Sequence, residues 1–326
     1  MNKEKILITG GGGYIGSILT SKLLENDYKI RIFDKFTFGL EPLVQVINNP
    51  NLEVMMGDIR NIDDLKKSIR DVDYIVHLAA IVGDPACSVQ GDVAVETNFL
   101  STIRLARLAR ENKIKKFIFA STCSVYGASG NNIIDETSTT NPVSLYAETK
   151  LDAEKELLTL LDNGPSLTIL RFGTAYGLSP RMRLDLVVNS LTKKAFLDKE
   201  IKIFGGTQWR PFVHIKDISN AIYLIVEANI EKVKGEIFNV GSTNENYQME
   251  DLGKTIKECI PDTRVIKVKE ITDNRSYRVS FKKIKSVLYF SNNMNIKKGV
   301  DEIKKALANG SIKNPSNPIY YNHKMI

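Results

Sequence analysis

The chain has 326 residues, of which 43% are hydrophobic and 25% charged, and a formal net charge of +7. This composition is ordinary for a folded chain of one large or two smaller domains and excludes a disordered protein, and no run approaches the ~20 apolar residues that cross a bilayer. Because the positive charge is spread along the chain and alternates with apolar residues, it is typical of solvated faces rather than of a nucleic-acid site, and a phosphate-bearing small molecule would suit the same charge.

The beginning of the chain, MNKEKILITG, passes from charged residues directly into a short strand. It lacks the apolar stretch of about 7–15 residues that a secretory signal requires. The three cysteines, Cys87, Cys123 and Cys259, are far apart and odd in number, which argues against a disulfide framework. We therefore expect a cytoplasmic protein that is not bound to a membrane.

Short β-rich segments then alternate with longer helical patterns. The sequence predicts strands at 5–9, 29–34, 52–58, 73–80, 115–121 and 166–172, and helices at 14–26, 62–71, 93–112 and 144–163. This order is typical of βαβ units on a parallel sheet whose two faces are both covered. We therefore predict an α/β fold built on a Rossmann-type, doubly wound parallel sheet.

The alternation stops after about residue 173, in the loop-rich passage GTAYGLSPRMRLD. A helix at 186–196 and a strand at 201–204 follow, and we expect them in a smaller C-terminal lobe. Residues 213–229 and 236–240 are predicted as a helix and a strand that return to the main sheet. The tail from 308 to 326 carries Asn, Pro and Gly turn signals, so we expect it to be partly disordered.

A glycine-rich turn, TGGGGYIG, joins the first strand to the first helix. Gly10, Gly13 and Gly16 permit a tight turn that brings backbone N–H groups close to a pyrophosphate at the positive end of the helix. Alone, the turn would also suit a loop without a ligand. The second strand, however, ends in Asp34, where a carboxylate can bind the adenosine ribose. Asp34 repels a 2′-phosphate and so favours NAD over NADP, although the adjacent Lys35 acts in the opposite direction.

Two later strands end in residues that suit the same cofactor. Asp58, in the segment GDI, is placed to hydrogen-bond the adenine amino group, and the small residues of HLAA, 77–80, let the backbone lie against the cofactor. We expect His77 itself to be a packed strand residue rather than a catalyst.

The segment ASTCSVYG, 120–127, carries three hydroxyls and a thiol in four consecutive positions after a buried strand. Further on, YAETK places Tyr146 and Lys150 on one face of a helix. A phenol is a poor base at neutral pH, but a neighbouring ammonium and a nicotinamide cation lower its pKa. A shift of about three units requires about 4 kcal/mol of extra stabilisation of the phenolate relative to the phenol. Such a pair is common on surface helices, but after a dinucleotide-binding turn it indicates acid/base chemistry for hydride transfer at a carbinol carbon.

Together these motifs resemble the extended short-chain dehydrogenases/reductases that act on nucleotide sugars. The resemblance covers essentially the whole chain, through TGGGGYIG, HLAA, ASTCSVYG, YAETK and RPFVHIKD. It implies an NAD-binding domain of residues 1–173 with 213–241, and a nucleotide-sugar-binding lobe of residues 174–212 with 242–326. It also implies a homodimer that forms through the helices around 95–112 and 144–163.

The resemblance assigns the catalytic roles to Thr122, Tyr146 and Lys150. Thr122 would hydrogen-bond the sugar hydroxyl that is oxidised, Tyr146 would take its proton, and Lys150 would bind the nicotinamide ribose and keep the tyrosine pKa low. No metal is expected. The implied NAD-binding residues are Gly10, Gly13, Tyr14, Ile15, Gly16, Asp34, Lys35, Asp58, Ile59, Leu78, Ala79, Ala80, Tyr146 and Lys150.

The residues after Thr122 bear on the reaction. Relatives that dehydrate the sugar carry an Asp-Glu pair there, and decarboxylating relatives have a Glu before the VYG. This chain has Cys123 and Ser124, so both of those reactions lose support. A cysteine acts as an acid/base group in relatives that epimerise next to a ketone, but Cys123 lies one position away from that place, and we favour a packing role for it.

On the substrate side, the resemblance assigns Arg210 and Arg275 to the pyrophosphate of the nucleotide sugar, since guanidinium groups suit phosphate oxygens. Either arginine could instead form a surface ion pair. Asp185 is expected to pair with Arg181 or Arg183, or to contact sugar hydroxyls. The implied substrate-binding residues are Val82, Thr122, Ser124, Thr174, Arg210 and Arg275.

We therefore expect NAD-dependent oxidation, at C4, of the sugar of a nucleoside diphosphate sugar, by a 4-epimerase or a 4-dehydrogenase. The segments AAIVGDPAC and SPRMRLDLVVN resemble a subgroup that includes dehydrogenases of GDP-linked heptoses. The alternatives are a C3/C5 epimerase, a 4-ketoreductase, a hydroxysteroid-type dehydrogenase and a non-catalytic NAD(H)-sensing regulator. The intact Thr122, Tyr146 and Lys150 argue against the regulator, and the phosphate-binding arginines argue against a steroid substrate.

Overall fold

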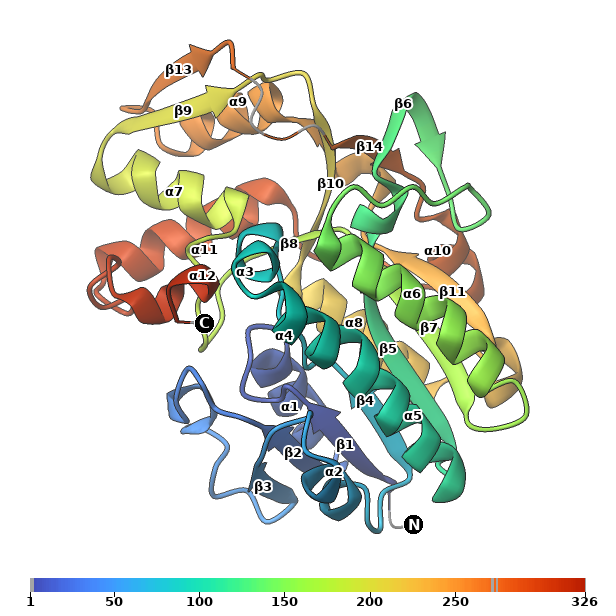
Figure 1. Ribbon diagram of the computed structural model, residues 1–326. Coiled ribbons are helices and arrows are strands. Elements are labelled where there is room, and N and C mark those ends of the chain that lie inside the picture. The colour runs from blue at the N-terminus through green and yellow to red at the C-terminus, as the bar shows by residue number, and fades with distance from the viewer. Residues whose placement is uncertain (1–2, 271–272, 274, 326) are drawn as a thin grey trace.

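The computed structural model describes residues 3–270, 273 and 275–325. Its centre is a seven-stranded parallel sheet with the strand order β11-β7-β5-β4-β1-β2-β3 (Figure 1). The order reverses between β1 and β4, which is the arrangement of a doubly wound sheet and confirms the predicted fold class. The strands are β1 (Lys5–Thr9), β2 (Lys29–Asp34), β3 (Leu52–Met56), β4 (Tyr74–His77), β5 (Lys116–Thr122), β7 (Ser166–Phe172) and β11 (Glu236–Val240).

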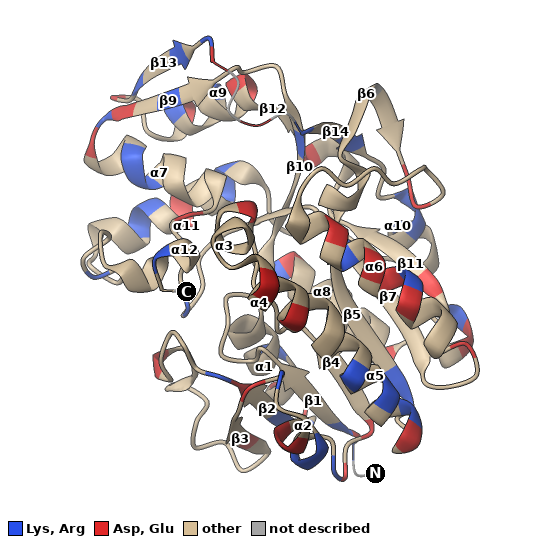
Figure 2. Cartoon of the chain, viewed as in Figure 1, with Lys and Arg blue, Asp and Glu red and all other residues tan. Residues whose placement is uncertain are grey.

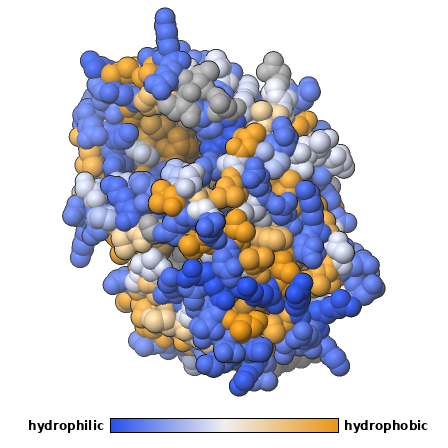
Figure 3. Space-filling view, viewed as in Figure 1, coloured by the Kyte–Doolittle hydropathy of each residue, from blue (hydrophilic) through white to orange (hydrophobic). Residues whose placement is uncertain are grey.

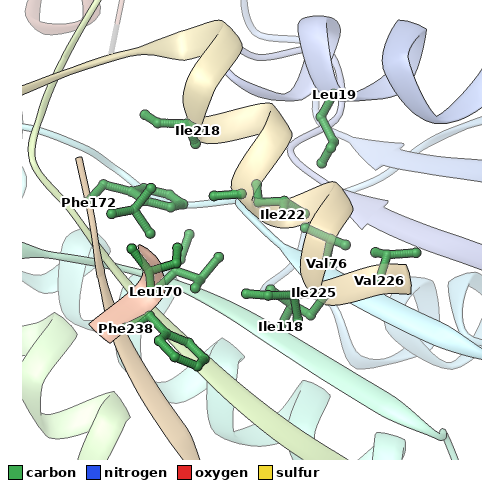
Figure 4. Packing of buried hydrophobic residues seen from close by; sticks show 14 of the residues in the cluster. Leu19, Val76, Ile118, Leu170, Phe172, Ile218, Ile222, Ile225, Val226 and Phe238 are labelled. Carbon is green, nitrogen blue, oxygen red and sulfur yellow. The ribbon is translucent and has the colours of Figure 1, made fainter. Parts of the chain in front are cut away.

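Helices cover both faces of this sheet, because alternate strand residues are apolar on each side. On one face, Ile6 and Ile8 pack with α1 (Gly16–Leu24) and α8 (Ile215–Glu227), and Figure 4 shows the isoleucines of α8 against this core. On the other face, Leu7 packs with α2 (Ile62–Ser68), α5 (Ser101–Glu111) and α6 (Leu145–Leu160). Basic and acidic residues are interspersed over the visible helices, as the sequence indicated (Figure 2).

The smaller lobe lies beyond the carboxyl ends of the strands (Figure 1). In the described residues, it contains the small sheets β12-β10-β8, β13-β9 and β14-β6. The first two sheets and helices α7, α9 and α11 share an apolar core of their own, whereas β14 and β6 pack on the main core. The elements are β6 (Ala128–Ile134), β8 (Thr174–Tyr176), α7 (Val187–Leu197), β9 (Glu200–Phe204), β10 (Trp209–His214), β12 (Asn246–Gln248), α9 (Met249–Cys259), β13 (Arg264–Val268), β14 (Ser276–Val279) and α11 (Ile296–Ala308); α10 (Lys282–Leu288) packs on the main core.

Strand β14, from the second predicted domain range, pairs with β6, from the first. The proposed division of the chain into 1–173 with 213–241 and 174–212 with 242–326 therefore stays a prediction. Within the described chain, no helix has the length and apolar character needed to cross a membrane.

Two predicted helices differ from the structure. Val213 and His214 complete strand β10, and α8 starts at Ile215, because the His214 side chain accepts a hydrogen bond from the Lys216 N–H and caps the helix. The expected helix over 93–112 is divided into α4 (Gly91–Val95), a π-helical turn (Glu96–Leu100) and α5.

The expectation of a partly disordered tail is wrong for the described residues. The tail forms a 3₁₀ turn (Pro318–Tyr320) and a short helix, α12 (Asn322–Met325). Tyr321 and Asn322 are buried. The Tyr321 ring packs with Met182 and Leu184, and the Asn322 side chain accepts a hydrogen bond from Arg181, in the loop after β8. The local turn signals do not reveal these partners. Ile326 lies outside the described residues.

Candidate active site

A cavity of about 1200 Å³ lies over the carboxyl ends of the central strands, between the sheet and the smaller lobe. Figure 3 shows part of this recess beside α7 and β9, with apolar residues at its base. The volume exceeds the roughly 300–1,000 Å³ of a pocket for one small ligand, so it leaves room for a cofactor and a substrate together. Every residue that the sequence assigned to the cofactor, the substrate or catalysis lines this cavity.

The glycine-rich turn forms one end of the cavity. Gly10 has a φ of +75°, and a Cβ atom at this position would lie 2.8 Å from the backbone nitrogen of Ala79. At Gly16 a Cβ atom would lie 2.2 Å from the carbonyl oxygen of Gly10. Neither position admits a side chain without a shift of the backbone, so the turn stays tight at the N-terminus of α1. This cradle fits a dinucleotide pyrophosphate.

Asp34, at the end of β2, holds the neighbouring turns. Its carboxylate accepts hydrogen bonds from the N–H groups of Gly12 at 2.9 Å and Phe36 at 2.8 Å. Burial raises the pKa of Asp34. The adjacent Lys35 is 61% exposed and lies 3.5 Å from Asp58, so its charge is directed away from Asp34. In the structure, Lys35 therefore gives less support to NADP binding than its place in the sequence did.

The other predicted cofactor residues lie beside this turn. Asp58 pairs with Arg60, whose guanidinium holds the pKa of Asp58 well below its usual range. His77 is buried between the hydroxyls of Thr9, at 2.7 Å, and Thr102, at 2.9 Å. Burial lowers the pKa of His77 to about 3, so the ring is neutral. It is a packed strand residue, as expected.

The three predicted catalytic residues meet at the end of β5. The Thr122 hydroxyl accepts a hydrogen bond from the Ser124 N–H at 3.1 Å. It also lies close enough to the Tyr146 phenol to act against the effect of burial on the pKa of that phenol. Tyr146 lies in the first turn of α6, which Ser144 caps. One turn later, the Lys150 ammonium donates to the carbonyl oxygen of Ala120 at 2.8 Å.

Burial dominates the electrostatics of this group. Sequence reasoning expected Lys150 to lower the pKa of Tyr146, but in the structure burial raises it. Among the charges that act against burial, that of Arg183 has the largest effect. Burial also lowers the pKa of Lys150 to about 8. The sequence located the pair correctly but did not reveal how deeply it lies.

A buried ion pair fixes α6 against the sheet. Glu154 accepts hydrogen bonds from Arg171 of β7, at 2.6 Å and 3.1 Å, and from the Ser121 hydroxyl. Glu154 lies one turn beyond Lys150, and Ser121 precedes Thr122 in the chain. The pair therefore holds the helix that carries Tyr146 in register with the strand that carries Thr122.

Cys123 and Ser124 face different surroundings. Cys123 is 1% exposed and packs in the main core, where its thiol lies 3.3 Å from the carbonyl oxygen of Arg171. Burial raises the pKa of this thiol. These contacts support the packing role. Ser124 lines the cavity, with its hydroxyl 3.3 Å from that of Tyr277, a residue that sequence reasoning missed.

The substrate end of the cavity brings the predicted arginines together. Arg210 and Arg275 lie 2.8 Å and 2.6 Å from the carboxylate of Asp273, and Arg275 also lies 2.6 Å from Asp84. Asp185 pairs with Arg183 at 2.9 Å, which is one of the expected partners. The two diphosphate candidates thus form one cationic group, whose present partners are side-chain carboxylates.

Comparison with known proteins identifies the family to which the chain belongs. Residues 6–241 match the model of the NAD dependent epimerase/dehydratase family. The chain belongs to this family. It is 34% identical over 249 residues to YtcB of Bacillus subtilis, named as an uncharacterized UDP-glucose epimerase, and the alignment covers 73% of this chain and 76% of that protein.

Other members carry different activities in their names. The chain is 30% identical over 269 residues to a UDP-N-acetyl-alpha-D-glucosaminuronate decarboxylase of Bacillus cytotoxicus, with 80% and 79% of the two chains covered. The crystal structure of UDP-glucuronic acid 4-epimerase from Bacillus cereus, in complex with UDP-glucuronic acid and NAD, superposes with a TM-score of 0.84 and 28% identity, and covers 94% of this chain and 99% of the other. The protein is thus an NAD-dependent nucleotide-sugar enzyme of the epimerase/dehydratase type.

Proposed function

We propose that the protein is a 4-epimerase of a nucleoside diphosphate sugar, which oxidises C4 and returns the hydride to the opposite face. The main support for this proposal is the kind of acid/base groups that line the cavity. The hydroxyls of Thr122 and Tyr146 meet there, which suits removal of the proton from a sugar hydroxyl.

The cavity lacks a free carboxylic acid among its described lining residues. Each carboxylate is held by an arginine or by backbone N–H groups, and Cys123 is closed into the core. A dehydratase or decarboxylase needs further acid/base groups, whereas a C4 oxidation needs only the Thr122–Tyr146 pair. The carboxylates concerned are Asp34, Asp58, Asp84, Asp185 and Asp273.

In the proposed reaction, Thr122 orients the C4 hydroxyl, Tyr146 exchanges its proton, and Lys150 contacts the nicotinamide ribose. NAD, when bound, supplies the hydride acceptor. The buried pair of Glu154 and Arg171 keeps Tyr146 and Thr122 within reach of one hydroxyl. Because burial raises the pKa of Tyr146, the phenol is protonated at neutral pH in the absence of further positive charge, which suits its role as the acid in the return step.

The substrate class follows from the arginines and from the relatives. Arg210 and Arg275 form the cationic group that a diphosphate would occupy, and guanidinium groups bind phosphate oxygens in pairs. The names of two relatives, a UDP-glucose epimerase and a UDP-glucuronic acid 4-epimerase, support a nucleoside diphosphate hexose or its uronic acid.

The test is a panel of UDP-, GDP- and dTDP-linked hexoses, heptoses and uronic acids, incubated with the NAD-loaded protein. The product is analysed by NMR, and NADH is followed by absorbance. A 4-epimer without net NADH supports the proposal. One NADH released for each sugar oxidised would make the protein a 4-dehydrogenase, and loss of water or carbon dioxide, or no reaction with any sugar, contradicts C4 epimerisation.

A further inference from the structure

Arg181, in the loop after β8, is a buried cation with unused hydrogen-bonding capacity. It is 4% exposed and lines the cavity. One terminal nitrogen donates to the side-chain oxygen of Asn322 at 2.5 Å, and the guanidinium lies 3.6 Å from the centroid of the Phe38 ring. Within the described residues, its Nε and the other terminal nitrogen are buried without a hydrogen-bond partner.

Such an arrangement is costly unless an anion completes it. A buried charged donor without a partner loses its hydration and gains nothing in return. Burial and the like charge of Arg183 lower the pKa of Arg181 to about 9, which is the response of a cation without a close counter-ion. The two free N–H groups are therefore suited to donate hydrogen bonds to an anionic ligand in the cavity.

The position of Arg181 indicates which anion it meets. The Ser179 hydroxyl donates to the carbonyl oxygen of Tyr14 at 2.8 Å and lies 3.2 Å from the hydroxyl of Ser17, while the Arg181 N–H donates to Ser179 at 3.2 Å. These bonds attach the loop to the first turn of α1, whose N-terminus faces the same cavity. The charge of Asp34, at the ribose end, also acts on Arg181.

We propose that Arg181 binds a diphosphate, namely the pyrophosphate of NAD, from the side opposite the glycine-rich turn. Its Nε and free terminal N–H groups donate to the phosphate oxygens, while the backbone N–H groups at the N-terminus of α1 donate from the side of the glycine-rich turn. The nucleotide sugar also carries a diphosphate, but Arg210 and Arg275 lie at the other end of the cavity. The assignment does not depend on the position at which the sugar is oxidised.

The C-terminal segment holds this arginine in place. The Asn322 side chain accepts a hydrogen bond from Arg181, and the backbone N–H of Asn322 donates to the Asp185 carboxylate at 3.1 Å. The backbone N–H of Leu184 donates to the carbonyl oxygen of Tyr320 at 2.9 Å. Residues more than a hundred positions beyond the glycine-rich turn thus complete its cofactor site. The tail is a positioning segment for the arginine in this proposal.

The test measures binding by the full-length protein freed of NAD, without turnover. Arg181→Gln keeps a polar side chain, although a shorter one, and removes the charge and the guanidinium. Calorimetric titrations use ADP, adenosine and UDP as probes. We expect at least tenfold weaker binding of ADP, with adenosine and UDP changed less than twofold. Arg181→Lys should weaken ADP less than Gln does, because the charge remains and the planar fork is lost.

Two controls separate this role from a structural one. Arg264→Gln makes the same chemical change on exposed β13, where Arg264 pairs with Glu200, and should leave all three affinities unchanged. Asn322→Ala should weaken ADP by about threefold and spare adenosine, and it replaces Arg181→Gln if that variant does not fold. The proposal would be overturned by any of three results: an equal loss of affinity for ADP and adenosine, an unchanged affinity for ADP, or a loss of affinity confined to UDP. Failure of the C4 reaction would leave these binding results untouched.

Discussion

For single residues, the site depends on two hydroxyl groups that lie close together and on how deeply they are buried. Thr122 and Tyr146 meet at the end of β5, and Tyr146 is shielded from water, so burial raises its pKa. Cys123, although it is the next residue in the chain, faces the opposite side of the strand end and packs in the core. Neighbouring positions in one short segment therefore have opposite environments.

Replacement of Tyr146 by Phe should lower turnover by roughly 10²–10⁴, the loss typical of a missing general acid/base, while NAD binding changes little. Thr122→Val should act in the same direction but more mildly, because it removes a hydrogen bond rather than the proton acceptor. Single-turnover reduction of bound NAD by the nucleotide sugar measures both effects.

Cys123→Ala and Ser124→Ala serve as controls for this measurement, since neither side chain moves the proton or the hydride. We expect both to retain the oxidation step nearly unchanged. If either abolished that step while Thr122→Val spared it, the assignment of roles within 120–127 would be wrong.

We expect Asp34 to determine the preference between NAD and NADP. Its carboxylate is held by the N–H groups of Gly12 and Phe36 and repels a 2′-phosphate, while Lys35 is directed toward Asp58. NAD should therefore bind at least tenfold more tightly than NADP, a difference of about 1.4 kcal/mol. Fluorescence titration of both cofactors tests this, and equal affinities would refute it.

At the element scale, tertiary contacts decide where helices begin and bend. The segment 213–229 is helical in pattern, but β10 extends to His214 because it pairs with β8 along Phe212, Val213 and His214. Similarly, the 3₁₀ turn that ends in Glu245 places this carboxylate on the N-terminus of α11, where it accepts the Ile296 N–H at 3.1 Å. Glu245 is 8% exposed, so its charge is poorly solvated.

Glu245 should make the stability of the fold depend on pH. Burial raises its pKa from the ordinary 4.5 to about 7. Between these values the folded protein holds a proton that the unfolded chain has released. The stability that Glu245 contributes is therefore complete below about pH 4.5 and is lost as the pH rises through about 7.

Glu245→Gln removes this titration and keeps an acceptor for Ile296. The free energy of unfolding of the variant, relative to the unmodified protein, should rise by up to about 3 kcal/mol between pH 4.5 and 7.5. Urea unfolding followed by circular dichroism measures it, with the exposed Glu111→Gln as the control. Parallel pH profiles for the two proteins would contradict the assignment.

At the scale of the whole molecule, one surface suits a second copy of the chain. Helices α5 and α6 pack side by side on the outside of the sheet (Figure 1), and apolar side chains gather among charged ones over this region (Figure 3). Val89, Leu100, Val143 and Leu158 are exposed large hydrophobic residues on or beside α4, the π turn and α6. Such residues are typical of an interface core.

We therefore predict a homodimer through α5 and α6, which light scattering at micromolar concentration tests. The double variant Leu100→Lys with Leu158→Lys should shift the protein to the monomer, because it places two charges in the buried interface. Leu197→Lys, on α7 of the smaller lobe and also exposed, is the matched control and should stay dimeric. A monomeric unmodified protein under these conditions argues against this interface.

Features that depend on near neighbours in the chain were predictable from the sequence. Strand and helix periodicity predicted the central sheet, and glycine spacing predicted the turn at Gly10. The i, i+4 spacing of Tyr146 and Lys150 predicted a shared helix face, and all these features are present in the structure. Local spacing suffices there because backbone geometry relates residues that lie within one turn or one strand.

Features that depend on burial and on distant partners became visible only in the folded structure. Arg181 meets Asn322 from 141 positions away, and the pKa of Tyr146 rises because the smaller lobe and the sheet together exclude water. The tail, which has the composition of a loose end, is ordered by those same contacts. Solvation and long-range pairing are properties of the folded arrangement, and no short stretch of sequence contains them.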